Sequence, residues 1–450
     1  MIAADSKERY LTAFEQWQSN GNANAPVWLK ELRRSGIASF AALGFPTTKN
    51  EDWKYTSVEP IASLPVAQAN GAAATVSHSD VVVRSFADAA CPRLVFVNGA
   101  WVRETSSPQD LPQGVRLASL AELVARDDPL LPTELGRYAN HSTQPFVALN
   151  TAFMGDGAVV LIPPGRRLNR PIYLIYASTG GAGHLVSYPR TLIFLGAGSE
   201  AKIVESYVGV NGGTYFCNAV TELVAGPGAL VEHHRLQREG PAAFHIGTLE
   251  ADLKSGARLT AHAVTLSGSL VRNNVRVSLN GEGAECVLNG LYLAGEKQHI
   301  DNFTEIDHLK PRATSFELYK GILDGAAHGV FNGKIVVHKN AQKSDARQVN
   351  KNLLLSEHAA VNTKPQLEIY ADDVKCSHGS TIGQMDADAL FYLRSRGLGL
   401  EEARSLLSFA FATDIIGRIK IDSLRRQLED YLVAKFARRE WSHEGSISLG

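Results

Sequence analysis

Two residues with metal-binding side chains, Cys376 and His378, stand two positions apart in the C-terminal part of the chain. Residues 367–375, just before them, are rich in β-branched, aromatic and aliphatic types, and this composition predicts a strand. On a strand, residues i and i+2 project from the same face, roughly 6.6 to 7 Å apart. The thiol and the imidazole are therefore expected to point into one space, just before a break at Gly379. Because thiolate and imidazole both bind iron and zinc, the pair predicts a metal site.

A Cys-x-His pair also has a plain structural explanation, in which a buried cysteine packs as a small hydrophobe beside a solvated loop histidine. The spacing of the cysteines limits the alternatives. Four cysteines stand at positions 91, 217, 286 and 376, and no two of them form a C-x-x-C pair. This isolation argues against a disulfide framework, a zinc ribbon and a ferredoxin-like site. If a metal binds, this chain is expected to supply only part of its ligands.

The composition is that of an ordinary soluble globular protein. The 450 residues are 44% hydrophobic and 20% charged, which suggests two or three structural regions. The formal net charge of −1 implies no general attraction to nucleic acid or to an anionic membrane. The first residues lack the apolar core of a signal peptide, and no run reaches 18 apolar residues. We therefore expect a cytoplasmic protein.

The texture of the sequence changes along the chain. Residues 1–60 carry apolar residues at helical spacing, and residues 61–144 mix short apolar, polar and Ala/Gly-rich segments. Residues 145–383 consist of short Val-, Ile- and Leu-rich runs punctuated by glycine, and helical texture returns over residues 384–444. The sequence thus predicts a β-rich core between helical N- and C-terminal regions, with a mixed connecting region after the first.

A loose repeat runs through the β-rich core. A glycine turn, a small residue and an apolar strand recur at Gly198, Gly228, Gly256, Gly283 and Gly325. The first three steps, of 30, 28 and 27 residues, suit the coils of a parallel β-helix, and the last step, of 42, would carry an insertion. An antiparallel sandwich remains the alternative on this pattern alone.

The C-terminal region predicts one helix over residues 386–396, closed by Gly397, and one or two more over 401–437. Apolar residues between 405 and 416 are not confined to one stripe, so this helix needs two burial surfaces. Packing against its own β-helix and a neighbouring helix is one explanation. Docking of a partner on the face that holds Leu407 and Phe411 is the other.

Several sites of common enzymes are missing from the sequence. It has no G-x-x-x-x-G-K-[ST] loop, so this chain is not expected to bind or hydrolyse a nucleotide, and it has no G-x-S-x-G elbow. His233, His234 and His262 lack a zinc-site context and are read as core or surface histidines. Asp372 and Asp373, as neighbours on a strand, would face opposite sides and give little support to a two-carboxylate site.

Several stretches of the chain resemble the SufB/SufD family of iron–sulfur cluster assembly proteins, and its SufD branch in particular. The resemblance lies in residues 44–56, 146–157, 162–165, 171–172, 350–355, 364–379 and 391–397, and the last-but-one stretch contains Cys376 and His378. It implies a right-handed parallel β-helix with helical N- and C-terminal regions. It also implies a non-enzymatic scaffold subunit that pairs with a SufB-type paralogue.

The same resemblance implies that a SufC-type ABC ATPase docks on the C-terminal helices, for which Leu407 and Phe411 are the candidate contacts. It places His378, with Cys376 as the second candidate, at the SufB interface as ligands of a transient iron–sulfur cluster shared with SufB. A homodimer of the isolated chain stays open. Two rival functions are a purely structural partner of an ATPase and a polysaccharide-active β-helix enzyme. The enzyme is disfavoured by the absence of a signal peptide and by an aromatic content of only 8%.

Overall fold

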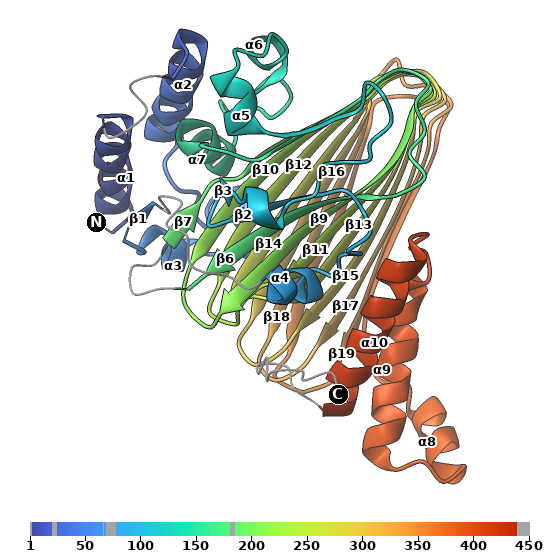
Figure 1. Cartoon of the computed structure of the whole chain (residues 1–450). Coiled ribbons are helices and arrows are strands. Elements are labelled where there is room, and N and C mark those ends of the chain that lie inside the picture. Colours follow the sequence, from blue (N-terminus) through green and yellow to red (C-terminus); the bar gives the residue numbers. More distant parts are fainter. Residues whose placement is uncertain (1, 20–24, 66, 69–77, 181–184, 439–450) are drawn as a thin grey trace.

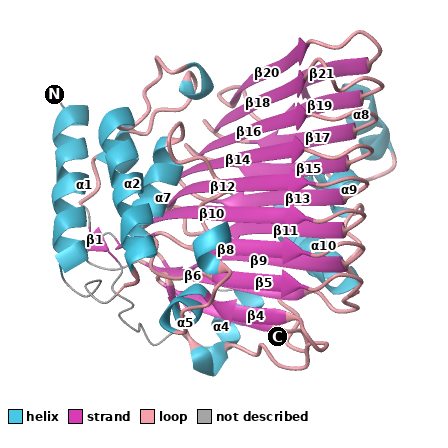
Figure 2. Cartoon of the chain, turned by 90° about the horizontal axis from the view of Figure 1, so that it is seen from above, coloured by secondary structure: helices cyan, strands magenta, loops and turns pink. Residues whose placement is uncertain are grey.

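The computed structural model describes residues 2–19, 25–65, 67–68, 78–180 and 185–438. Its centre is a parallel β-helix of about eight turns, in which two facing sheets are linked coil by coil (Figures 1 and 2). The predicted fold class is confirmed, and the antiparallel sandwich is excluded because successive coils pair in parallel.

Each coil contributes one strand to each sheet. The main strands of the first sheet are β5 (Ala158–Ile162), β8 (Arg190–Leu195), β10 (Phe216–Ala225), β12 (Phe244–Leu253), β14 (Leu270–Leu279), β16 (His299–His308), β18 (His328–Val337) and β20 (Ala360–Ile369). Those of the second sheet are β6 (Ile172–Thr179), β9 (Glu200–Asn211), β11 (Leu230–Arg238), β13 (Arg258–Ser267), β15 (Glu285–Ala294), β17 (Thr314–Leu323), β19 (Asp345–Leu354) and β21 (Lys375–Gln384). Side chains that point inward from both sheets fill the space between them.

Glycine turns on one rim of the β-helix set the path from the first sheet to the second. Gly198, Gly228, Gly256 and Gly283 all adopt a left-handed conformation, with φ between 64° and 69°. Their N–H groups donate to the equivalent turn of the next coil, with acceptors Pro227, Ser255, Glu282 and Pro311. The predicted equivalence of these four glycines is confirmed.

The assignment of Gly325 to the same series is wrong. Gly325 follows β17 and lies on the opposite rim, where the chain passes back to the first sheet. The residues equivalent to Gly283 in the next two coils are Arg312 and Lys343, which take the left-handed conformation at φ 59° and 62°. The steps are therefore 29 and 31 residues, and the core carries no insertion there. The search for recurring glycines missed these two turns because their left-handed residues are arginine and lysine.

The first end of the β-helix is covered. Strand β2 (Arg93–Val97) pairs in parallel with β6, and β4 (Arg116–Ser119) pairs antiparallel with β5. The remaining short strands are β1 (Ala67–Gln68), β3 (Ala100–Trp101) and β7 (Leu185–Ser187). The helices of the N-terminal half are α1 (Ile2–Ser19), α2 (Val27–Leu43), η1 (Glu51–Trp53), α3 (Glu59–Ala62), α4 (His78–Arg84), η2 (Arg103–Thr105), α5 (Leu120–Ala125), α6 (Leu131–Glu134) and α7 (Pro145–Phe153). Helices α1, α2 and α7 group on one side of the molecule (Figure 1).

One buried ion pair ties α7 to the first sheet. Arg190 and Glu222 are both fully buried, and their nearest nitrogen and oxygen lie 2.6 Å apart. Arg190 also donates to the side chain of Asn150 on α7, at 3.1 Å. Glu222 accepts from the backbone N–H groups of Gly136, Tyr138 and Ala139. Because every charge of this pair is met by hydrogen bonds, it fixes the connecting region and α7 on the sheet.

The C-terminal region forms three helices, α8 (Ala387–Ser395), α9 (Leu400–Ile416) and α10 (Asp422–Arg438). Asp386 caps α8 by accepting from Ala389 N–H, and Gly397, at φ 96°, follows the helix end as predicted. Helices α9 and α10 pack on the outer face of the second sheet (Figure 1) through a buried apolar row. The row consists of Ala412, Ile415, Ile416, Ile419, Ile421, Leu424, Leu428, Leu432 and Phe436. Residues 439–444 of the predicted C-terminal region lie outside the described residues.

No helix of the described residues is both long and apolar enough to cross a membrane.

One substitution at each of two turns, Gly256 and Lys343, tests whether these turns are equivalent. A side chain at Gly256 would meet open space, so Gly256→Ala should cost only the left-handed backbone penalty, about 1 kcal/mol. Lys343→Gly should instead raise the free energy of unfolding by about 0.5 kcal/mol, since glycine relieves that penalty. Urea denaturation of both full-length variants measures the two effects. Equal destabilisation by both would contradict the equivalence of these turns.

Candidate functional site at the open end of the β-helix

Cys376 and His378 lie at the start of β21, the edge strand of the second sheet. The expectation that a strand over 367–375 delivers them is wrong. Strand β20 ends at Ile369, a turn follows, and β21 begins at Lys375. Gly379 does not break the strand either, because it pairs with Val349 of β19 inside the continuous register. Pairing with the previous coil sets where β21 begins and ends. The local composition of the sequence does not reveal these limits.

The two side chains share the inward-facing side of the last coil. Cys376 pairs with Ala346, and His378 pairs with Gln348, both of which are buried inside the β-helix. Cys376 is half-buried and packs against the inner apolar core, whereas His378 is exposed. Among the described residues no further coil covers β20 and β21. The inner face of the last coil therefore opens to the outside, with the imidazole at its surface.

A column of buried polar residues lies directly beneath His378, one residue from each of the two preceding coils. On the two preceding coils, the residues in register with it are Gln348 and then Glu317. The Gln348 amide Nε2 donates to Glu317 Oε2 at 2.9 Å, and Glu317 is fully buried. Burial raises the pKa of the Glu317 carboxyl to about 7. The imidazole thus stands over a lumen that holds a carboxyl group titrating near neutral pH.

The two candidate ligands differ in how readily they bind metal. Burial raises the pKa of the Cys376 thiol, and the nearby charge of Asp345 raises it further. Cys376 must therefore lose a proton to a metal or a base before it can act as a thiolate ligand. The imidazole of His378 is exposed at the surface of the last coil, where a metal can reach it. The arrangement favours His378 as the more available ligand.

The acidic pair beside the site does not form a carboxylate pair on a strand. Asp372 and Asp373 lie in the turn between β20 and β21, and both are exposed. The expectation of one residue on each strand face is wrong, because this segment leaves the sheet to pass around the rim. Their place at the rim gives no buried two-carboxylate site.

The three histidines read as core or surface residues are all buried. His233 faces the lumen, where its Nε2 lies 3.5 Å from Glu205 Oε2. His234 and His262 stack on the outer face of the second sheet, with ring centroids 4.8 Å apart. Glu232 is beside them, 3.2 Å from His234 Nε2, and accepts from the N–H of Lys420 after α9. This cluster is a contact between the sheet and the C-terminal helices that the sequence pattern did not show.

The proposed ATPase contacts are only partly accessible. Leu407 and Phe411 are half-buried on α9, and Phe411 has the Lys320 ammonium 3.9 Å above its ring. More exposed apolar side chains lie nearby on α8 and at the start of α9. They are Phe391 at 75%, Tyr392 at 56%, Leu400 at 40% and Leu406 at 46% exposure. The apolar face offered by the C-terminal region is thus wider than the two predicted residues.

The segment 44–56 connects the N-terminal region to the coils near the open end. The Arg272 guanidinium lies 3.8 Å from the ring centroid of Trp53, and Thr56 donates to Asp301 on β16. Glu51 forms an ion pair with Lys364 on β20. Residues 44–56 therefore have a structural role, because their contacts hold the N-terminal region against the coils as far as the edge strand β20.

Comparison with known proteins decides the family. Residues 176–411 match the family described as SUF system FeS cluster assembly, SufBD core domain, and residues 4–174 match the SufBD protein N-terminal region. The chain belongs to the SufBD family. A relative named iron–sulfur cluster assembly SufBD family protein, from Synechocystis sp., is 35% identical over 88% of this chain and 89% of its own length.

Two further relatives show where in the SufBD family this chain lies. The iron–sulfur cluster assembly protein SufD of Escherichia coli is 31% identical over 92% of this chain and 95% of its own length. The chloroplastic protein ABCI7 of Arabidopsis thaliana is 30% identical over 90% of this chain and 85% of its own length. The resemblance to SufD predicted from the sequence is confirmed, and the role shown at family level is iron–sulfur cluster assembly.

The buried carboxyl beneath His378 predicts a pH dependence of stability. Because the pKa of Glu317 is raised in the folded chain, its contribution to the free energy of unfolding is complete below about pH 4.5 and is lost as the pH rises to about 7. Glu317→Gln should remove this dependence, so its stability relative to wild type should increase by up to about 3 kcal/mol from pH 4.5 to pH 8. Urea denaturation at both pH values measures the difference.

The exposed Glu357, in the turn after β19, supplies the matched control. Glu357→Gln should change stability by the same small amount at both pH values. A relative stability of Glu317→Gln that does not change with pH would show that the carboxyl does not titrate as its burial implies.

Proposed function

We propose that this chain is a non-catalytic subunit of a scaffold complex that assembles iron–sulfur clusters. In this complex it pairs with a SufB-type paralogue and docks a SufC-type ABC ATPase. His378, with Cys376 as a weaker contributor, supplies ligands to a nascent cluster at the SufB interface. The cluster is cargo shared between the two subunits, and this chain binds no nucleotide. The observation that carries the proposal is the uncovered last coil, which places a thiol and an imidazole at an open end.

The open end is suited to another β-helix. β20 and β21 are edge strands, and their outer N–H and C=O groups have no further strand to pair with among the described residues. A paralogue with the same coil dimensions can add strands to both sheets and cover the inner face of the last coil. Such pairing would bury Cys376 and His378 between two chains, so each chain need supply only part of the ligand set.

The ligand chemistry agrees with a cluster that is held and then released. Soft thiolate and borderline imidazole both bind iron. A scaffold must give up its cluster, and a shared, incomplete ligand set releases iron more readily than four thiolates from one chain. The four cysteines are free thiols. This state agrees with the reducing cytoplasm, where we place the complex.

Docking of the ATPase is assigned to the C-terminal helices. Their exposed apolar side chains gather on α8 and the start of α9, away from the face that packs on the second sheet. Large exposed apolar residues near one another mark an interaction surface more often than scattered ones. Leu407 lies on the same helix and borders this group.

The ligand proposal predicts a difference between three alanine variants in the complex co-expressed with its partners. His378→Ala removes an exposed side chain, so the chain should fold and assemble, but anaerobically isolated complexes should lose most of their visible cluster absorption. Cys376→Ala should have a smaller effect. His358→Ala, an exposed histidine in the β19–β20 turn, is the matched control and should load clusters like wild type. If His378→Ala complexes carry as much iron and sulfide as wild type, the chain is a purely structural partner.

The docking proposal predicts that charge on the exposed C-terminal face prevents capture of the ATPase. Phe391→Glu and Leu407→Glu should reduce ATPase co-purification at least tenfold while the SufB-type subunit stays bound. Phe411→Glu should also reduce capture but lower the thermal midpoint, because Phe411 packs under Lys320. Val83→Glu, at an exposed apolar position on α4, controls for added charge. Undiminished capture by both Phe391→Glu and Leu407→Glu would place docking elsewhere.

A further inference from the structure

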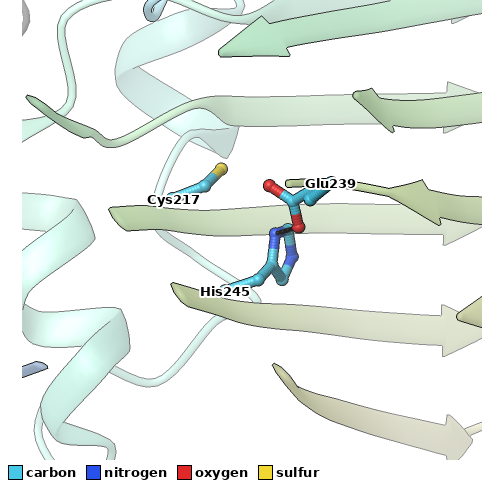
Figure 3. A group of neighbouring side chains, drawn as sticks. All are labelled: Cys217, Glu239 and His245. Carbon is cyan, nitrogen blue, oxygen red and sulfur yellow. Dashed lines mark ion pairs between the residues drawn. The ribbon is translucent and has the colours of Figure 1, made fainter. Parts of the chain in front are cut away.

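A second group of metal-binding side chains lies inside the β-helix, far along the chain from Cys376. Cys217 on β10, Glu239 after β11 and His245 on β12 are each at most 1% exposed. One ligand atom from each, the thiol sulfur, a carboxylate oxygen and an imidazole nitrogen, lies within 4.8 Å of the others. Figure 3 shows the three side chains pointing toward one another.

The coil register brings two of these residues together. Cys217 and His245 are direct Cα partners on adjacent coils, so their side chains leave the first sheet side by side. Glu239 reaches them from the rim where the chain returns from the second sheet to the first. On the coils to either side, the residues in register are Ser187 and Val271. The group is therefore enclosed on both sides along the axis of the β-helix.

Three polar atoms of this group, on Glu239 and His245, have no hydrogen-bond partner among the described residues. His245 Nδ1 lies 2.8 Å from Glu239 Oε2, yet neither atom meets hydrogen-bond geometry with a described residue. His245 Nε2 likewise lacks a hydrogen-bond partner among the described residues. Each buried unsatisfied polar atom costs about 1 to 3 kcal/mol. The one contact among these atoms is the ion pair between His245 and Glu239, drawn as a dashed line in Figure 3. The unsatisfied imidazole and carboxylate atoms converge with the thiol in one buried space, as ligands around a shared centre do.

The buried Glu232, His234 and His262 group also has unsatisfied atoms, Nδ1 of both histidines, but its carboxylate is hydrogen-bonded. There the imidazole of His234 hydrogen-bonds the carboxylate, and the carboxylate also accepts from Lys420 N–H. Those contacts account for the burial of that carboxylate by joining the sheet to the C-terminal helices. The Cys217 group has no such structural role visible in the described residues.

We propose that Cys217, Glu239 and His245 form an internal binding site for one borderline divalent transition metal ion, of the Zn²⁺ or Fe²⁺ class. Thiolate, imidazole and carboxylate together suit such ions and not the hard Mg²⁺ or Ca²⁺. In tetrahedral coordination, metal–ligand bonds of about 2.0 to 2.3 Å put ligand atoms roughly 3.3 to 3.8 Å apart. The three ligand atoms here all lie within 4.8 Å of one another, so small side-chain movements would bring them to a common ion.

Binding displaces the proton of the thiol. Burial and the charge of Glu239 raise the pKa of the Cys217 thiol, so the metal-free thiol is protonated at neutral pH. The metal forms a bond to the sulfur as the S–H proton leaves to solvent, while a neutral imidazole and a carboxylate supply the other two bonds. The site lies apart from the open end, so it does not depend on the cluster-binding role of His378.

Cobalt is the probe, because Co²⁺ bound to thiolate gives a charge-transfer absorption that Co²⁺ bound to nitrogen and oxygen alone does not. The parent protein is the full chain carrying Cys376→Ser and His378→Ala, which removes the ligands at the open end. Co²⁺ is added to the folded chain and also during refolding from urea, so that slow entry into an enclosed site cannot hide binding. We expect one equivalent of Co²⁺ with the thiolate band, and competition by Zn²⁺.

Cys217→Ser should abolish the thiolate band, and Glu239→Gln and His245→Gln should each weaken binding at least tenfold. Cys286→Ser is the matched control, since Cys286 is an equally buried lumen thiol outside the group, and it should keep the band. His262→Gln should keep it as well. Zn²⁺ should also raise the thermal midpoint of the parent but not that of Cys217→Ser, provided that this variant shows the far-ultraviolet spectrum of the fold. A parent that shows no thiolate band under either loading condition, or a band that persists in Cys217→Ser, would overturn the proposal.

Discussion

The structure depends on one constraint, which is that the backbone of each coil must be hydrogen-bonded by a coil on either side. Between β5 and β21 this condition is met by parallel pairing in both sheets. At the first end it is met by β2 and β4, with α7 fixed through the buried pair Arg190–Glu222. At the last end the described chain supplies no cover. The β-helix therefore has one closed end and one end with unpaired edge strands, and the second is where we propose that a partner binds.

The same stacking explains why the chemistry gathers where it does. Residues in register on successive coils form columns, and a column that is buried in the middle of the β-helix becomes exposed at its last coil. The column that ends at His378 contains Glu317 and Gln348 in its interior. The proposed site is therefore the exposed end of an internal polar column.

Stacking of the coils also brings together residues that are far apart in the sequence. Cys217 and His245 lie 28 positions apart in the sequence, about one coil, and become direct neighbours. A β-helix can thus assemble ligand sets from single residues without any local motif. This property explains how a chain without C-x-x-C pairs still places a thiol, an imidazole and a carboxylate within 4.8 Å of one another.

The sequence by itself determined the fold class, since turns near 28 residues apart and short apolar runs match the length of one coil. It also determined the family, through stretches such as residues 364–379, and the limits of α8. It could not determine the strand ends around Cys376, because the register on β19, not local propensity, extends β21 through Gly379. It misplaced Gly325, since Arg312 and Lys343 adopt left-handed turns without glycine.

Only the tertiary structure decided which side chains meet. The exposure of His378, the half-buried state of Cys376 and Phe411, and the grouping of Cys217, Glu239 and His245 all follow from the stacking of coils and from the helices packed on them. The period of the repeat predicts the length of one coil and that the coils stack. The register between coils depends on contacts summed over every strand pair. A shift of one residue would turn each inward side chain outward, and no local pattern of residues carries that information.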